Sequence, residues 1–172
     1  VTVLSSPGRA LGLFAQSDIP AGSIVLYQPP LLLVLDAIAS VDIPPPALRA
    51  SQSPRMEKLD GLCGYRREEW ESTERGILWS NGFGVLSGAT TRVFDRISRA
   101  NHSCLPNSRF VWCDAPAGGS GGREEEGEVG RMMLFSTFDL MVGEEITVDY
   151  GHGVQGLRKW YGFECVCGGC DG

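Results

Sequence analysis

The sequence lacks a long hydrophobic run and an excess of basic residues, and each absence excludes a class of protein. No apolar stretch approaches the ~18 residues that a transmembrane helix needs, so we expect no membrane span and no membrane partner. Lys and Arg total 15 against 21 Asp and Glu, a net charge of −6. A surface built to bind duplex DNA needs a basic face. We therefore expect no direct nucleic-acid partner, and the acidic balance suits a cationic substrate.

The glycine motifs of nucleotide-binding folds are missing as well. The chain has no P-loop, and the glycines of residues 8–14 (Gly-Arg-Ala-Leu-Gly-Leu-Phe) are not spaced as in a dinucleotide fingerprint. We expect no strand before this segment, which by itself predicts only a turn.

What is present indicates one domain of short strands and turns. The chain has 172 residues, of which 42% are hydrophobic, 23 are glycine and 10 are proline. That is long enough for a core and rich in loops. Residues 24–27 and 31–35 are β-rich runs, and residues 18–22 predict a turn. Residues 1–35 are therefore expected to form an N-terminal β half.

Residues 36–80 change in character and predict a small helical insert. Within them, residues 65–80 are rich in helix formers and place Trp70, Thr73 and Ile77 on one helical face.

Beyond the insert the pattern returns to strands. They are expected at residues 110–112, 131–138 and 145–150, within a C-terminal half spanning 81–160. Residues 114–130 contain six Gly and four Glu and predict a flexible loop.

Six cysteines are unevenly spaced, and three of them form a C-x-C-x2-C cluster at Cys165, Cys167 and Cys170. This spacing favours metal ligation in a reducing compartment over a disulfide framework, so we expect an intracellular location, nuclear or cytoplasmic. A structural Zn²⁺ takes four tetrahedral ligands. The candidates for the fourth, with a cysteine favoured over a histidine, are Cys63, Cys104, Cys113, His102 and His152. The alternative is three reduced surface thiols at a frayed terminus.

Residues 99–107 (Arg-Ala-Asn-His-Ser-Cys-Leu-Pro-Asn) are small, polar and turn-prone. They fit an ordinary turn with buried side-chain hydrogen bonds. They also fit a Cys–His pair of a hydrolase, and spacing alone does not choose between the two.

Residues 143–151 predict a turn followed by a strand in which Ile146, Val148 and Tyr150 share a face. We interpret Glu144 and Glu145 as turn residues. A tyrosine at a strand end, followed by glycine, can present its hydroxyl to a cleft; a core tyrosine is the alternative.

Taken together and in this order, these segments resemble a SET domain, the fold of many protein lysine methyltransferases. The segments that carry the resemblance are the opening motif at 8–22, the Asn-His-Ser-Cys-x-Pro-Asn motif within 96–107, the tyrosine motif at 143–151 and the post-SET zinc segment at 163–170. The chain is most similar to the SET-and-MYND branch and its fungal relatives, which residues 81–85 (Asn-Gly-Phe-Gly-Val) support. The insert has only Cys63, so it cannot hold a MYND finger.

The resemblance implies an α+β, mostly β fold. It is a single SET domain of several short sheets with a pseudoknot-like threaded C-terminal segment. The helical insert lies at 36–80 and a zinc-binding post-SET tail at 161–172. We expect a monomer.

The resemblance also implies S-adenosylmethionine as methyl donor and S-adenosylhomocysteine as product. The implied cofactor-binding residues are Arg9, Leu11, Asn101, His102, Tyr150 and Phe163, the last stacking on the adenine. The implied zinc ligands are Cys104, Cys165, Cys167 and Cys170. The zinc would be structural and would pin the tail over the cofactor.

Tyr150 is the implied catalytic residue for methyl transfer to a lysine of a histone tail or another protein. Its hydroxyl would orient the reacting groups, and an apolar channel walled by Phe83, Val148 and Tyr161 would lower the pKa of the lysine by desolvation. Because Val148 is smaller than the aromatic residue of some family members, it predicts a roomier channel that permits di- or trimethylation.

Two alternatives come from other classes. One is a catalytically weak or inactive SET-fold module, stapled by zinc, that binds basic peptides without turnover. The other is a zinc- or thiol-dependent hydrolase, which predicts an open metal position or a depressed pKa at Cys104.

Overall fold

The computed structural model describes residues 1–35, 58, 61–62, 73–84, 90–114 and 130–170. Most of the expected insert and loop, with Cys63 and Trp70, therefore lie outside the described residues.

A four-stranded sheet joins segments from both ends of the chain. Its order is β1 (Thr2–Ser5), β2 (Leu11–Phe14), β10 (Glu145–Val148) and β7 (Asn101–His102). The β10–β7 pair is parallel, with Thr147 opposite Asn101, and brings the motif at 101–107 beside the tyrosine motif. The pseudoknot-like threading of the C-terminal segment, which the family resemblance implies, stays a prediction.

The strand β1 corrects one expectation. A strand does precede the segment at 8–14, and Gly8 turns the chain between β1 and β2 with φ of 70°. A four-residue strand that ends at Ser5 carries little periodicity, so the sequence pattern does not predict it.

The second sheet has the order β3 (Ile24–Gln28), β9 (Arg131–Ser136) and β8 (Ser108–Cys113). Alternation is clear on β9, where Met132 and Leu134 are buried between more exposed neighbours. The strands expected at residues 110–112, 131–138 and 145–150 are thus confirmed as β8, β9 and β10. Two of them end early, β9 at Ser136 and β10 at Val148.

The third sheet has the order β4 (Leu32–Leu35), β6 (Thr90–Val93) and β5 (Gly82–Gly84), and helix α4 (Thr73–Asn81) leads directly into β5. A Cβ at Gly82 would collide with the Leu78 carbonyl oxygen and the Thr91 side chain, so only glycine permits this tight exit from the helix. Ile77 is buried, as expected for the apolar helix face.

The main core lies between the first two sheets and the short helix η1 (Ile97–Arg99). Its buried members are Leu13, Phe94, Ile97, Ala100, Met132, Leu134, Leu140, Ile146 and Val148. Burying such side chains contributes ~1.5–3 kcal/mol each relative to exposure. Because Leu13, Ile146 and Val148 belong to this core, it holds the first sheet and its edge strand β7 in place.

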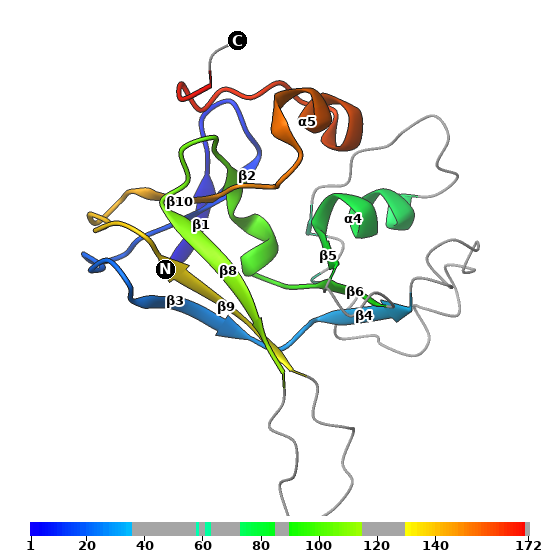
Figure 1. Cartoon of the computed structure of the whole chain (residues 1–172), viewed down its shortest axis with the longest axis horizontal. Coiled ribbons are helices and arrows are strands. Elements are labelled where there is room, and N and C mark those ends of the chain that lie inside the picture. Colours follow the sequence, from blue (N-terminus) through cyan, green and yellow to red (C-terminus); the bar gives the residue numbers. More distant parts are fainter. Residues whose placement is uncertain (36–57, 59–60, 63–72, 85–89, 115–129, 171–172) are drawn as a thin grey trace, which may run out of the picture.

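Helix α5 (Gly153–Tyr161) follows β10 in the chain and is capped by Gly162, whose φ of 73° is left-handed. The chain then turns back over the loop that follows β7 (Figure 1). Among the helices in the described part of the chain, none is both long and apolar enough to cross a membrane.

Candidate active site and metal centre

Four cysteines that are distant in sequence come together where the tail meets the first sheet. The Sγ atoms of Cys104, Cys165, Cys167 and Cys170 all lie within 4.8 Å of one another. The Cys104 and Cys165 sulfurs are 3.7 Å apart, close to the ~3.8 Å expected for two thiolates that share a tetrahedral zinc. Cys113 lies at the end of β8 and is not in the group. Of the five candidates for the fourth ligand, the structure brings Cys104 to the cluster.

The pKa values of two of these thiols, Cys104 and Cys167, are shifted in opposite directions. Burial and the neighbouring thiols raise the pKa of Cys104 to about 12. Burial also acts to raise the pKa of Cys167, but hydrogen bonds outweigh it and lower that pKa to about 6. The donors include the backbone N–H groups of Cys104 and Gly169, each 3.4 Å from the Cys167 sulfur. A bound cation would favour the thiolate of Cys104 and oppose this rise in its pKa.

The raised pKa of Cys104 also bears on the hydrolase alternative. A nucleophilic cysteine needs a depressed pKa, and Cys104 has the opposite shift. Its sulfur faces three other thiols instead of an open cleft. The geometry therefore disfavours a Cys–His hydrolase.

His102, which precedes this cysteine by two residues, is 3% exposed. Burial lowers the pKa of its imidazole, Asp149 acts to raise it, and Arg9 acts to lower it. The ring is therefore neutral at physiological pH. It lies beside Tyr150, with ring centroids 5.4 Å apart.

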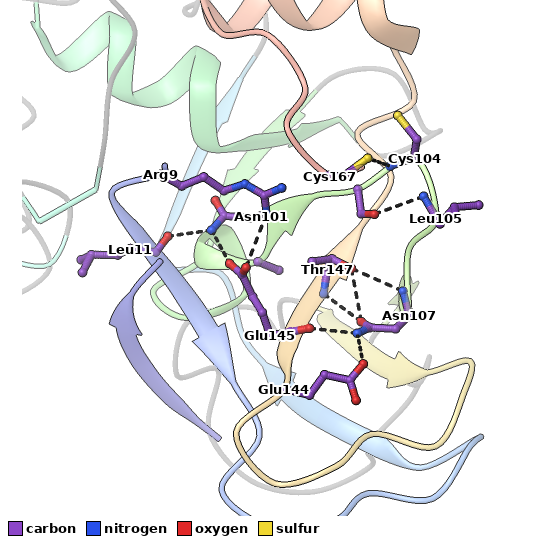
Figure 2. A network of polar contacts seen from close by, with 12 residues as sticks. Arg9, Leu11, Asn101, Cys104, Leu105, Asn107, Glu144, Glu145, Thr147 and Cys167 are labelled. Atoms are coloured by element: carbon purple, nitrogen blue, oxygen red, sulfur yellow. Dashed lines mark hydrogen bonds and ion pairs between the residues drawn. The ribbon is translucent and has the colours of Figure 1, made fainter. Parts of the chain in front are cut away.

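A polar cluster surrounds the Asn101 side chain (Figure 2). Its amide nitrogen donates to the Leu11 carbonyl at 3.0 Å and to the Glu145 carboxylate at 2.7 Å. The same carboxylate lies 3.5 Å from the Arg9 guanidinium. Since both amide hydrogens are used, the oxygen of Asn101 remains as an acceptor.

Glu145 is the functional residue that sequence reasoning missed. The strand expected from residue 145 is confirmed and the turn interpretation of Glu145 is wrong, because Glu145 is the first residue of β10 and pairs with Phe14. Gly12 leaves the space that it needs, because a Cβ there would collide with the Glu145 carboxylate. Gly12 of β2 and Glu145 of β10 therefore depend on each other. Their proximity follows from the pairing of two strands that are distant in sequence.

Asn107 forms a second polar cluster on the same loop (Figure 2). Its amide nitrogen donates to the Glu145 carbonyl at 2.8 Å and to the Glu144 carboxylate at 3.1 Å, and its oxygen accepts from the Thr147 N–H at 2.9 Å. One side chain thereby ties the end of the 101–107 loop to β10. The side-chain hydrogen bonds expected for a turn are present here, but they are part-buried or exposed and not buried.

Two cavities adjoin at Tyr150. The first, about 260 Å³, is lined by the predicted cofactor residues Arg9, Leu11, Asn101, His102, Tyr150 and Phe163, among others. The second, about 200 Å³, is lined in part by Phe83, Phe110, Ala100 and His152. Five residues contribute to both walls: Ser80, Asn81, Ser98, Tyr150 and Tyr161. The sizes approach the lower end of ligand pockets, ~300 Å³.

The Tyr150 hydroxyl donates its proton to the Ala100 carbonyl at 3.0 Å. A phenol oxygen accepts hydrogen bonds as well as donating one. The ring packs against Tyr161, with centroids 4.9 Å apart. Burial raises the pKa of Tyr161, so that phenol stays neutral.

The structure separates Val148 from the other predicted channel residues. Phe83 and Tyr161 line the second cavity, whereas Val148 is 2% exposed within the main core and lines neither cavity. Val148 and Tyr150 both pack against the main core, as expected for a shared face, although β10 itself ends at Val148. Val148 lies within this core and not in a cavity wall. The channel-width argument for multiple methylation therefore has no geometric basis.

Comparison with known proteins places this geometry in a family. The SET domain family model matches residues 10–151. Histone-lysine N-methyltransferase set5 of Schizosaccharomyces pombe is 22% identical over 189 residues, covering 98% of this chain and 50% of that protein. The chain thus spans about half the length of this relative.

Among solved structures, the crystal structure of a candidate histone methyltransferase of Plasmodium falciparum matches with a TM-score of 0.49 and 14% identity, covering 88% of this chain and 93% of the other. The family-model match extends over most of the chain and includes Tyr150, which lines both cavities. On this match, the chain belongs to the SET domain family.

Proposed function

We propose that this chain is an S-adenosylmethionine-dependent protein lysine N-methyltransferase with a structural zinc ion. The observation that carries the proposal is the pair of cavities that share Tyr150 and Tyr161 in their walls. Methyl transfer needs a donor and an acceptor to meet in line at one point. Two cavities that adjoin at a hydroxyl supply such a point.

The first cavity fits the cofactor by its donor set. The Asn101 oxygen is an acceptor for an ammonium group, because its amide hydrogens are already engaged. Phe163, 37% exposed in the cavity wall, offers a ring face for adenine. The charge of Arg9 is balanced by Glu145, so the cavity can accept a cationic ligand. S-adenosylmethionine, when bound, supplies a methyl group on a positively charged sulfur.

The second cavity fits a lysine side chain. Its aromatic walls include Phe83 and Phe110, whose rings meet edge to face at 4.9 Å. Such walls desolvate an amine and lower its pKa, so that the neutral nucleophile forms. The Tyr150 oxygen, whose proton goes to Ala100, accepts a hydrogen bond from that amine and orients its lone pair. The amine proton leaves to solvent after transfer.

The zinc proposal depends on the donor chemistry. Four thiols within 4.8 Å form a closed, sulfur-only set, which is typical of structural zinc. The tail that carries three of them also carries Phe163. A metal bound there would therefore hold a wall of the first cavity in place.

The substrate is a protein lysine, and the name of the fission-yeast relative makes a histone the first candidate. The competing function is a SET-fold module that binds basic peptides without turnover. The acidic balance of −6 fits both. The two differ in whether the first cavity binds the methyl donor.

Calorimetry of zinc-loaded protein with S-adenosylmethionine tests the proposal first. We expect one-to-one binding, followed by methylated lysine in mass spectra of a histone mixture. Tyr150→Phe is expected to slow transfer by about 100-fold or more while cofactor binding persists. Tyr27→Phe, at an exposed tyrosine of β3, is the matched control. Absence of cofactor binding in folded, zinc-loaded protein would favour the peptide-binding module.

A further inference from the structure

His102 lies between the cysteine cluster and Tyr150 and contacts both through its two ring nitrogens. Nε2 is 3.4 Å from the Cys104 sulfur. Nδ1 is 3.2 Å from the backbone nitrogen of Tyr150. The residue is 3% exposed, so these contacts are shielded from water.

The contact with Tyr150 fixes where the imidazole proton must be. A backbone N–H only donates, so Nδ1 accepts and carries no hydrogen. A ring that accepts at Nδ1 carries its hydrogen on Nε2, where it faces the Cys104 sulfur. Asp149 does not compete for the ring: its oxygen is 3.7 Å from Nδ1 and accepts the Gly151 N–H at 2.8 Å instead.

The backbone at Tyr150 needs such a partner. Strand β10 ends at Val148, so the sheet ladder no longer holds the amide of Tyr150 two residues later. The carbonyl of Val148 accepts the Ser103 N–H at 3.0 Å. Beyond Val148, the His102 ring binds the backbone N–H of Tyr150 and so holds the chain at that residue.

We propose that the His102 side chain is a positioning residue that couples the metal centre to Tyr150. Its Nε2–H donates to the Cys104 thiolate, and its Nδ1 holds the amide of Tyr150. Donors to metal-bound ligands orient the ligand and strengthen metal binding. The ring thus makes the placement of the tyrosine depend on how Cys104 is held. The inference rests on the metal site and tyrosine role proposed above.

Two substitutions separate the two ring contacts. His102→Asn keeps an acceptor near the Nδ1 position but cannot reach Cys104. His102→Gln keeps a donor near the Nε2 position but loses the acceptor for Tyr150. Zinc affinity, measured by chelator competition without cofactor, is expected to fall about 10-fold or more in His102→Asn and to stay within about 2-fold of wild type in His102→Gln. The turnover rate at saturating zinc is expected to fall more in His102→Gln.

Equal zinc affinities in the two variants, whether both unchanged or both reduced, would overturn the inference. Failure of the wild-type protein to bind zinc would refute the metal site itself, and the inference with it. Unchanged turnover of zinc-saturated His102→Gln would refute the link to Tyr150. The zinc measurement needs no methyl transfer, so its result is independent of whether the chain is an active enzyme.

A measurement on the wild-type protein covers the case in which a variant does not fold. The chain has two histidines, so long-range ¹H–¹⁵N spectra of the zinc-loaded protein resolve both rings. His152→Gln identifies the His102 signals by elimination. We expect His102 in the Nε2–H tautomer, with a slowly exchanging ring proton. A protonated Nδ1 would overturn the inference.

Discussion

The body of the domain and its tail are held in place by different means. The body, the described residues up to Tyr150, is built from three sheets around a buried core. The tail, residues 151–170, fully buries Leu157 and otherwise meets the body through its thiols and through the rings of Tyr161 and Phe163, which lie against Tyr150. The family-model match ends at residue 151 as well. The walls of the first cavity come from both regions, so part of the cavity depends on the packing of the body and part on how the tail is attached.

The largest effect is therefore expected from breaking the cysteine cluster. Cys165→Ser removes one thiolate, and we expect zinc affinity to fall by more than 100-fold and cofactor binding to be lost with it. The body should keep its far-ultraviolet circular dichroism, because its sheets do not use the metal. Metal content by mass spectrometry and cofactor binding by calorimetry give the two readouts.

Cys113→Ser is the matched control, since Cys113 ends β8 outside the cluster. It should leave zinc and cofactor binding unchanged. Cofactor binding that outlasts the zinc in Cys165→Ser would show that the tail is held by other contacts, and the contrast between the two regions would fail.

The same contrast explains what the sequence could predict. The strands of the second sheet were predictable from alternation, as on β9, because each is a local pattern. The gathering of Cys104 with the tail did not follow from local spacing, which left five candidates. The family resemblance named Cys104, and the fold brings it to Cys165, which lies 61 positions further along the chain. The separation of Val148 from the cavity walls was not predictable, because a shared strand face does not show which of its residues line a cavity. Glu145 was missed because its partners Asn101 and Arg9 are distant in the chain.

A smaller effect is expected within the body at Glu145. Glu145→Gln keeps an oxygen for the Asn101 amide but removes the charge that faces Arg9. An unbalanced guanidinium in the wall opposes a cationic ligand, so cofactor affinity should fall about 10-fold, and less at high salt. Glu144→Gln makes the same chemical change one residue earlier, in contact with Asn107 instead of Asn101. It should change cofactor affinity little, and equal losses in calorimetry would contradict a specific role for Glu145.

The smallest effect tests whether Gly12 and Glu145 act together. A Cβ at Gly12 would collide with the Glu145 carboxylate and lie 3.0 Å from the Asn101 amide nitrogen. Gly12→Ala should therefore reduce cofactor affinity a few-fold and stability by about 1–3 kcal/mol, the usual cost of overpacking. In a Glu145→Ala background the carboxylate is gone, so the same substitution should cost clearly less in both denaturation and calorimetry. Additive losses across the cycle would mean that the two residues act separately. A coupled loss would show that the body holds its cavity wall by packing, where the tail relies on its thiols.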